Sequence, residues 1–408
     1  MTSQSINQLI TIHKRLLSAT ETTRHRYLFD AFNINNRLTG LIGARGTGKT
    51  TLLLQFIKER LSKQQDAVIY VSLDHLYFSD HSLLDFVNEL YEVQGCRYFF
   101  FDEVHKHPNW NQILKNIHDS YPDVYVVFSG SSSIDLIQGT HDLSRRGVLF
   151  RLGGMSFREY LSFQGVAEIE PVGLEQLLSD RSALENQVAE IPKLRGYFKD
   201  YLQSGYYPFF LEGADTYQEK LLRVIDKTIY EDIANHYRLN TDKLPYFKRL
   251  LSYMATIQPG ELSRNNISKH VGLDNKTVQH YLHILQETGL AELIRDNRAG
   301  SQLLKANEKI YLDNPNLYQT ISHEIGQPSQ VGTVRELFFI KMLKHAGHQV
   351  YYSKVGDFEV DGVIFEVGGK GKTTKQIRDI EGAAYLVKDD ILYGGKQEIP
   401  LHLFGFLY

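Results

Sequence analysis

A glycine-rich segment followed by a lysine and a threonine has the residues needed to hold a phosphate chain. Residues 43–51 read GARGTGKTT, so four residues separate Gly43 from Gly48, and Lys49 and Thr50 follow. Glycines let the backbone fold around phosphates with its N–H groups pointing inward, and a helix that begins here adds its positive end. In this spacing the lysine reaches the β and γ phosphates and the threonine hydroxyl binds Mg²⁺. The predicted nucleotide-binding residues are Gly43, Ala44, Arg45, Gly46, Thr47, Gly48, Lys49, Thr50 and Thr51.

Two acidic residues supply what such a loop needs for hydrolysis. Residues 98–103 read YFFFDE, an apolar run that ends in Asp102 and Glu103. Mg²⁺ requires an acidic holder, and hydrolysis requires a positioned water molecule. We therefore expect Asp102 and Thr50 at the metal. Lys49 and Glu103 are the expected catalytic residues, with Glu103 polarising the attacking water.

The first part of the chain alternates short apolar runs with segments of helical periodicity. The runs LTGLIG, AVIYVSL, CRYFFFDE and VYVVFSG are almost continuously apolar, as strands covered on both faces must be. Each run is followed by a helical pattern. This order predicts an α/β fold, a parallel sheet with crossover helices, and residues 148–154 are a candidate fifth strand.

The rest of the chain changes character twice. Residues 156 to about 250 have a mostly helical pattern, and SGYYPFF at 204–210 is a turn rich in aromatic residues. Residues 262–296 have helix-turn-helix patterning, with a short helix, a turn at Gly272 and a longer helix from Asn275. An amphipathic helix then begins near residue 331, and strands follow it.

Composition narrows the classes of protein. The 408 residues, 42% of them hydrophobic, can bury the cores of two or three domains. A net charge of -3 means that any nucleic-acid contact must come from a local patch. The single cysteine excludes an intramolecular disulfide and a zinc site of several thiolates. We find no signal-peptide core and no run of the roughly 20 apolar residues that span a bilayer, so we expect a cytoplasmic protein.

Several blocks of the sequence are similar to those of one ATPase family. GARGTGKTTLL, FFFDEVHKHPNW, VVFSGSSS, SFREYL and EVDGVIFEVGGK resemble bacterial and archaeal AAA-like P-loop ATPases that carry a C-terminal winged helix and a nuclease-fold module. The resemblance implies ATP as the nucleotide. It also implies that the strand of VVFSG lies between the loop strand and the acidic strand, so Ser129 or Ser131 becomes a polar sensor near the γ-phosphate. Serines that cap a helix are an equally good interpretation.

The same resemblance implies a basic residue near the end of the sheet. Arg145 and Arg146 are the candidates, and either could act as an arginine finger on the transferring phosphoryl group. A solvated or salt-bridged surface pair is the competing interpretation.

The helix-turn-helix segment offers candidate DNA contacts. Lys276 and Gln279 fall on the exposed side of the predicted second helix, and Arg295 and Arg298 fall on a predicted wing. Winged helices also serve as lids or subunit contacts, and this segment is only weakly basic. Both DNA binding and protein contact stay open.

The tail has part of a nuclease-like acidic pattern. In such nucleases an Asp and a Glu hold a divalent metal, and a Lys two residues after the Glu assists the attacking water. Asp361 and Glu366 supply the acids, with Glu336 as a third, but Gly368 stands where the lysine belongs. Lys370 is the substitute, and it lies about 7 Å further along a strand. We expect the nuclease fold with little or no activity.

These expectations define four regions and one principal function. They are a P-loop ATPase domain at 1–155, a helical region at 156–255, a winged helix-turn-helix at 256–325, and an inactive restriction-endonuclease-like domain at 326–408. The expected function is Mg²⁺-dependent ATP hydrolysis that switches conformation and controls the binding of DNA or a partner. A non-hydrolysing nucleotide-gated scaffold and an ATP-regulated nuclease are the alternatives. Expected partners are double-stranded DNA, a second copy of the chain or another protein, with no membrane contact.

Overall fold

The computed structural model describes residues 2–130, 146–261, 263–297, 308–373, 375, 377 and 383–408. The chain divides into two compact units, Met1–Gly153 and Gly154–Tyr408. Among the described residues, no helix has the length and apolar character needed to cross a membrane.

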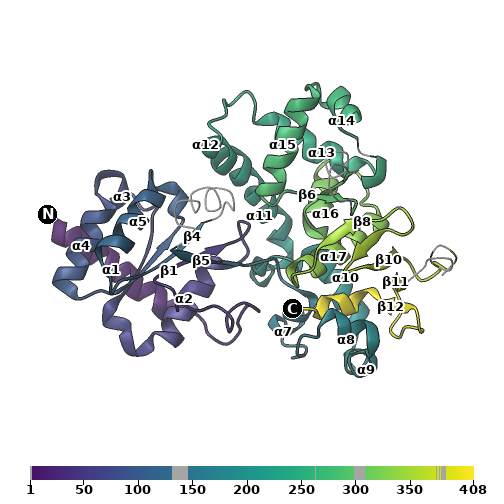
Figure 1. Ribbon diagram of the computed structural model, residues 1–408, viewed down its shortest axis with the longest axis horizontal. Helices are drawn as coiled ribbons and strands as arrows, with labels where there is room; N and C mark the ends of the chain where they lie inside the picture. The colour runs from purple at the N-terminus through teal and green to yellow at the C-terminus, as the bar shows by residue number, and fades with distance from the viewer. Residues whose placement is uncertain are drawn as a thin grey trace. The chain divides into compact units, whose positions relative to one another are not determined.

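The first unit, purple to blue in Figure 1, is built on a five-stranded sheet with the strand order β2-β3-β4-β1-β5. Every neighbouring pair in it is parallel, which confirms the predicted α/β sheet with crossover helices. Strand β4 lies between β3 and β1, and residues 147–151 form the fifth strand. The elements are α1 (Thr2–Ala19), β1 (Leu38–Ile42), α2 (Lys49–Arg60), η1 (Ser62–Ala67), β2 (Val68–Ser72), α3 (Tyr77–Asp80), α4 (Leu83–Gln94), β3 (Tyr98–Asp102), η2 (Val104–Lys106), α5 (Trp110–Ser120), β4 (Tyr125–Gly130) and β5 (Gly147–Arg151).

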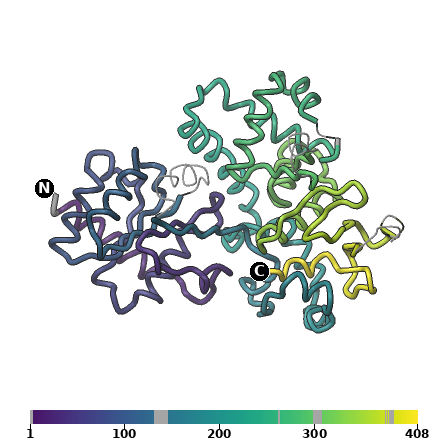
Figure 2. Tube along the Cα trace, in the orientation of Figure 1, coloured from purple at the N-terminus to yellow at the C-terminus, as the bar shows by residue number. Residues whose placement is uncertain are grey.

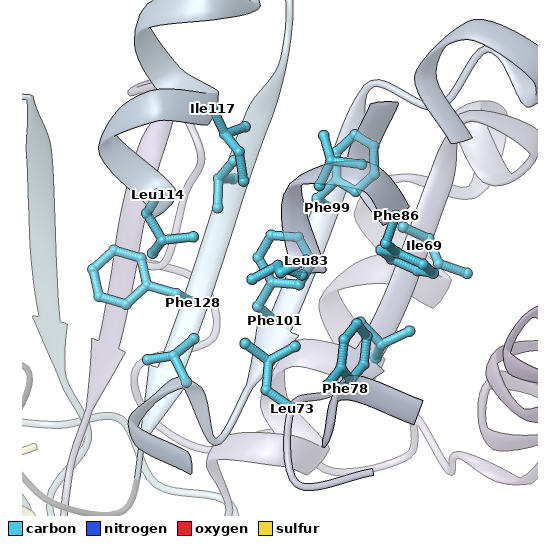
Figure 3. Close-up of a cluster of buried hydrophobic side chains, with 14 of the residues drawn as sticks. Ile69, Leu73, Phe78, Leu83, Phe86, Phe99, Phe101, Leu114, Ile117 and Phe128 are labelled. Carbon is cyan, nitrogen blue, oxygen red and sulfur yellow. The ribbon is translucent and has the colours of Figure 1, made fainter. Parts of the chain in front are cut away.

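Apolar side chains cover both faces of this sheet. Figure 3 shows one face, where Phe99 and Phe101 of β3 meet side chains of the helices α4 and α5, among them Phe86 and Leu114. Phe100 points the other way and packs in a second cluster with residues of α2. Because successive strand residues face opposite sides, a strand buried on both faces must be apolar at every position. This requirement explains the unbroken run YFFF.

A histidine accepts a hydrogen bond from the edge strand of the sheet. Strand β2 is an edge strand and pairs only with β3 in the described sheet. The Tyr70 N–H of β2 donates to Nδ1 of His13 on α1 at 3.2 Å, in a buried contact. Burial, together with the nearby charge of Lys14, lowers the pKa of His13 to about 4. The ring is therefore neutral near pH 7 and can accept this hydrogen bond.

The second unit, teal to yellow in Figure 1, joins helices to two further sheets. In the sheet of order β12-β11-β10-β9-β8, strands β8, β9 and β10 are antiparallel neighbours, whereas β10, β11 and β12 run parallel. Its helices are α7 (Phe157–Phe163), α8 (Leu174–Ser179), α9 (Ser182–Ala189), α10 (Leu194–Ser204), η3 (Pro208–Glu212), α11 (Ala214–Lys227), η4 (Thr228–Ile233), α12 (Ala234–His236), α13 (Pro245–Thr256), η5 (Pro259–Glu261), α14 (Arg264–Val271), α15 (Asn275–Glu287), α16 (Pro315–Glu324), α17 (Val331–His345) and η8 (Leu401–Phe406). Its strands are β6 (Ala291–Arg295), β7 (Glu308–Leu312), β8 (Val350–Tyr352), β9 (Phe358–Val360), β10 (Val363–Gly368), β11 (Ala384–Lys388) and β12 (Glu398–Pro400).

The aromatic turn predicted at 204–210 is held by hydrogen bonds to helix α16. Asn316 of α16 accepts hydrogen bonds from the Tyr206 N–H at 2.8 Å and from the Tyr217 hydroxyl at 2.5 Å. Its amide nitrogen donates to the carbonyl oxygen of Tyr201 at 3.0 Å. A buried amide with this many partners fixes the turn and the helices around it in one arrangement.

The end of the chain returns to the beginning of the second unit, as Figure 2 shows. Arg158 of α7 donates to the carbonyl oxygen of Tyr408 at 2.9 Å, and the Tyr408 hydroxyl donates to the carbonyl oxygen of Gly154 at 3.1 Å. Residues more than two hundred positions apart in the sequence therefore belong to one folded body.

The neutral state of His13 gives the first unit a specific sensitivity to acid. Its folded pKa of about 4 lies below the ordinary histidine value of 6.5, so between these two pH values the unfolded chain takes up a proton that the folded chain does not. Stability is therefore lost as the pH falls from about 6.5 towards 4. Denaturant unfolding at about pH 7 and about pH 5 should show wild type losing roughly 2 kcal/mol more than His13→Gln, which keeps a neutral acceptor. An equal loss in both proteins would contradict this role.

Candidate nucleotide-binding site

The segment between β1 and α2 forms a tight loop that only glycine allows at several positions. Gly46 and Gly48 have φ angles of 86° and 94°, in the left-handed region that disfavours side chains. A Cβ added to Gly43 would lie 2.3 Å from the carbonyl oxygen of Leu152, where no atom fits. The sequence spacing therefore corresponds to three distinct backbone requirements of the loop.

Lys49, the first residue of α2, directs its side chain back into the loop. The side chain is buried, and its Nζ donates to the carbonyl oxygens of Gly43 and Ala44, both at 2.9 Å. The ammonium group thus lies inside the loop, where a phosphate bound by the loop N–H groups would meet it.

Asp102 is the centre of the site. Asp102 is only 2% exposed. Its Oδ2 accepts hydrogen bonds from the Thr50 hydroxyl at 2.5 Å and from the Tyr70 hydroxyl at 2.8 Å. Its Oδ1 accepts from the Ser129 hydroxyl and from the Glu103 N–H, the latter at 3.1 Å. The structure therefore brings together Thr50 and Asp102, the two residues predicted at the metal.

These oxygens suit Mg²⁺, but two protein ligands are too few to enclose the metal without phosphates or water. Mg²⁺ prefers hydroxyl, carboxylate and water oxygens, and in nucleotide sites it takes one or two protein ligands together with the phosphates. Thr50 and Asp102 are such a pair. Within the described part of the chain, no group of three or more His, Cys, Asp or Glu residues could hold a metal by itself.

Glu103 follows Asp102 in a strained conformation. Its φ of 53° is unusual for a residue with a side chain, and such strain is concentrated at functional sites. The side chain is 21% exposed, and its Oε2 lies 3.4 Å from Nε2 of His105. Oε2 has no hydrogen-bond partner among the described residues. A carboxylate of this kind, next to the residue predicted to hold the metal, can accept a proton from water.

The position of Ser129 rules out one of its two sequence interpretations. It is buried within β4 and donates to Asp102, so the helix-cap interpretation is wrong for this residue. Its hydroxyl helps to orient the acid, and its contact to a γ-phosphate stays a prediction. Ser131, the other candidate sensor, lies outside the described residues.

Arg146 lies in a surface ion pair. Its Nε and Nη2 donate to the two carboxylate oxygens of Asp119 at 3.0 and 3.2 Å, and these hydrogen bonds lower the pKa of the Asp119 carboxyl. The structure therefore favours the surface-pair interpretation for this residue over the arginine finger. Arg145 lies outside the described residues.

Two residues of this site were not predicted from the sequence. Tyr70 is one, and burial together with the charge of Asp102 raises its pKa above the ordinary value, so it stays a hydrogen-bond donor. Arg26 is the other, and its buried guanidinium donates to the carbonyl oxygen of Thr47 in the loop and to that of Gly153 at 2.9 Å. Neither residue belongs to a spacing pattern, since both reach the site from distant segments.

The predicted DNA contacts are only partly available in the structure. Lys276 and Gln279 are exposed on α15, whereas Val278 and Tyr281 on its other face are buried, as their helical spacing predicts. Arg295 is different, because it forms an ion pair with Glu308 across the β6–β7 sheet at 2.8 Å. The Arg295 side chain stays largely exposed in this pair, so its contact to DNA stays a prediction. Arg298 lies outside the described residues.

The acidic residues of the tail are arranged differently from the prediction. Asp361 is in the turn between β9 and β10, mostly exposed, and pairs with His348 at 2.7 Å. Glu366 is buried on β10 and forms an ion pair with Lys372, which also lies 3.6 Å from Asp357. Lys372, and not the exposed Lys370, is therefore the lysine beside Glu366, and Asp357 lies near the same lysine.

Glu336 of α17 belongs to the same neighbourhood. It accepts a hydrogen bond from the Tyr311 hydroxyl at 2.6 Å, and burial raises its pKa, as the charge of Asp357 also does. Burial raises the pKa of Glu366 too, although the hydrogen bond from Lys372 opposes this shift. Three acids therefore gather here, and a lysine from a position that sequence spacing did not predict neutralises two of them.

Comparisons with known proteins agree with the geometry of the first unit. Residues 35–161 match a family described as an AAA domain, so this part of the chain is an AAA-like P-loop domain. Residues 195–327 match a family described only as a domain of unknown function. That match continues through residue 255, where we expected one region to end.

Comparisons by sequence and by structure also found partial matches to other proteins. An uncharacterized protein of Methanocaldococcus jannaschii is 24% identical over 85% of this chain and 78% of its own length. The structure of C. elegans PCH-2 has a TM-score of 0.28 and 20% identity, covering 48% of this chain and 58% of that one. AMPPCP-bound DnaA from Aquifex aeolicus has a TM-score of 0.26 and 16% identity, covering 64% of this chain and 84% of that one. The assignment of the P-loop domain rests on the loop geometry and the AAA match.

Arg26 should matter for nucleotide binding although it lies 21 residues before Thr47. Loss of hydrogen bonds from a charged donor costs about 1.5–3 kcal/mol, so Arg26→Ala should weaken binding of a fluorescent ATP analogue by roughly tenfold or more. Arg60→Ala is the matched control, since Arg60 forms an exposed pair with Asp30. Wild-type affinity in a folded Arg26→Ala protein would show that the loop does not depend on this residue.

Proposed function

We propose that this protein is a Mg²⁺-dependent ATPase that uses its nucleotide state to control the binding of DNA or a protein partner. The observation that carries the proposal is the hydrogen bond between Thr50 and Asp102 at 2.5 Å. Beside it, Oε2 of Glu103 accepts no hydrogen bond from the described residues and lies 3.4 Å from Nε2 of His105. Metal-holding and water-polarising groups therefore lie next to a complete phosphate loop.

The roles follow from these positions. Loop N–H groups and Lys49 bind the β and γ phosphates, and Thr50 and Asp102 hold the metal. When bound, Mg²⁺ neutralises charge on the phosphates. Tyr70 and Ser129 fix the orientation of the Asp102 carboxylate, and Glu103 orients a water molecule and accepts its proton.

The contacts of the loop also suggest how binding becomes a switch. The Lys49 ammonium donates to the loop carbonyls of Gly43 and Ala44, and a bound phosphate competes for it. Thr47, in the same loop, is linked through Arg26 to Gly153, the last residue of the first unit. A change in the loop on nucleotide binding is therefore transmitted to the residue where that unit ends.

The output of the switch is proposed to involve α15. The helices α13, α14 and α15, followed by the antiparallel β6–β7 pair, have the order of a winged helix. Lys276 and Gln279 are exposed on α15, but Arg295 of β6 pairs with Glu308, so the winged-helix region is only weakly basic. Binding of a protein in place of DNA is the competing output.

The two alternatives predicted from the sequence are less well supported. A non-hydrolysing scaffold has no use for a strained carboxylate beside the metal-holding acid, and Glu103 is such a group. An ATP-regulated nuclease needs carboxylates available to a metal, whereas the Lys372 ammonium pairs with Glu366 and lies near Asp357. We therefore propose that the C-terminal sheet has a nuclease-like fold without nuclease activity.

Two substitutions separate nucleotide binding from hydrolysis. Lys49→Ala should abolish tight ATP binding because it removes the buried ammonium group. Glu103→Gln should keep the affinity for ATP but lower phosphate release by about 100-fold or more, because it removes the proton acceptor. Hydrolysis at the wild-type rate in Glu103→Gln would assign the water to another residue. Wild-type binding without hydrolysis would favour the scaffold.

DNA binding should depend on Lys276 and on salt. Binding of a protein to DNA releases cations from the DNA, and added salt opposes that release. An electrophoretic shift assay with double-stranded DNA, with and without ATP, should therefore show affinity that falls as salt rises. Lys276→Ala should weaken binding and reduce the salt dependence, whereas Lys227→Ala, on the exposed surface of α11, should not. No shift at low salt in wild type would leave a protein partner as the output.

A further inference from the structure

The second unit contains a cavity that takes no part in nucleotide binding. Its volume is about 550 Å³, within the range of sites for small molecules. It is lined by one side of α10, the first turns of α17, residues 389–391 after β11, and His402 of η8. All of these elements belong to the second unit, so the cavity is formed without the P-loop domain.

One wall of the cavity is apolar and regularly built. Leu194, Phe198 and Leu202 follow each other at intervals of four residues on α10, and therefore share one face of the helix. Val334 of α17 adds a further apolar side chain. The ring of Phe198 lies 6.0 Å from that of His402, centre to centre, so two flat side chains line the cavity together. Such a wall suits a flat apolar body.

His402 supplies a polar group that its own chain does not use. The residue is 6% exposed, and its Nε2 has no hydrogen-bond partner in the parts of the chain that the structure describes. Burial lowers the pKa of its ring to about 4, so the ring is neutral near pH 7. A buried polar atom without a partner costs about 1–3 kcal/mol, which a ligand atom in the cavity would recover.

The charges around the cavity leave a positive surplus. Asp389 is engaged by Arg335 at 2.8 Å, and Arg335 also lies 3.8 Å from Asp390. Lys199 is exposed on α10, and no ion pair to it occurs among the described residues. Arg195, one turn before it, donates to a backbone carbonyl and not to a carboxylate.

The N-terminal end of α17 adds to this surplus. The helix begins at Val331, which lines the cavity, and it has no side-chain cap and no acidic residue in its first turn. Partial positive charge at a helix N-terminus favours an anion nearby.

We propose that this cavity is a binding site for a small organic anion with a flat apolar body, such as an aromatic carboxylate or sulfonate. The apolar body packs between Phe198 and Val334, and the anionic group lies towards Lys199 and the beginning of α17. Nε2 of His402 forms a hydrogen bond to a polar atom of the ligand. This site is additional to the proposed ATPase function and does not depend on it.

Anilinonaphthalene sulfonate, which fluoresces in apolar surroundings, is a suitable probe for the full-length protein. We expect a saturable signal with one strong site per chain. Gly196→Trp should fill the cavity, because Gly196 lines it and an added Cβ meets no atom within 4 Å. This variant should weaken probe binding by roughly tenfold or more, and Lys199→Glu by roughly fivefold.

Matched controls test place and charge separately. Gly173→Trp adds the same side chain where a Cβ also meets nothing, and Lys227→Glu reverses an exposed charge on α11, so both should bind the probe like wild type. Benzoate should displace the probe, and benzylamine, its cationic counterpart, should not. Wild-type probe affinity in Gly196→Trp would overturn the site, and equal displacement by benzylamine would overturn the preference for an anion. Circular dichroism confirms that each variant is folded.

Discussion

The architecture of the first unit depends on keeping one buried carboxylate hydrogen-bonded. A charge moved out of water costs several kcal/mol unless hydrogen bonds replace its hydration. Asp102 meets this requirement with donors from three other elements: Thr50 of α2, Tyr70 of β2 and Ser129 of β4. Strands β2, β3 and β4 must therefore be neighbours, and α2 must begin beside them. The order β2-β3-β4-β1-β5 satisfies these conditions.

This arrangement also explains why the chemistry is placed at one end of the sheet. In a parallel sheet all the carboxyl ends lie at the same edge, so the loop after β1 and the acids after β3 meet there. The apolar packing of Phe99, Phe100 and Phe101 on both faces fixes β3, and with it the direction of Asp102. Burial of the strand thus has a functional consequence, because a shifted β3 would leave the carboxylate without its donors.

Local patterns could be predicted from the sequence, whereas contacts between distant segments could not. The loop at 43–51 and the strand ending in Asp102 are continuous stretches whose spacing states a backbone requirement. Arg26 and Tyr70 are single residues in ordinary surroundings, and only the folded chain brings them to the site. The arrangement of the acidic residues in the tail differs from the prediction for a similar reason. Asp361 fits a linear motif, but it lies in the β9–β10 turn and pairs with His348, whereas Glu366 pairs with Lys372, which also lies near Asp357.

A second buried charge centre limits what the proposed nucleotide-driven change could move. Lys341 of α17 contacts Glu292 of β6 at 2.8 Å and Asp313 after β7 at 2.6 Å, all buried. Burial alone lowers the pKa of Lys341, but the two carboxylates raise it above its ordinary value, so the lysine stays charged. Separating such partners would leave unpaired charges in the interior, which is strongly unfavourable. The α15 face and the C-terminal sheet are therefore held in one body. In the proposed switch, a change that passes through Gly153 would therefore act on that body as a whole, and not on α15 alone.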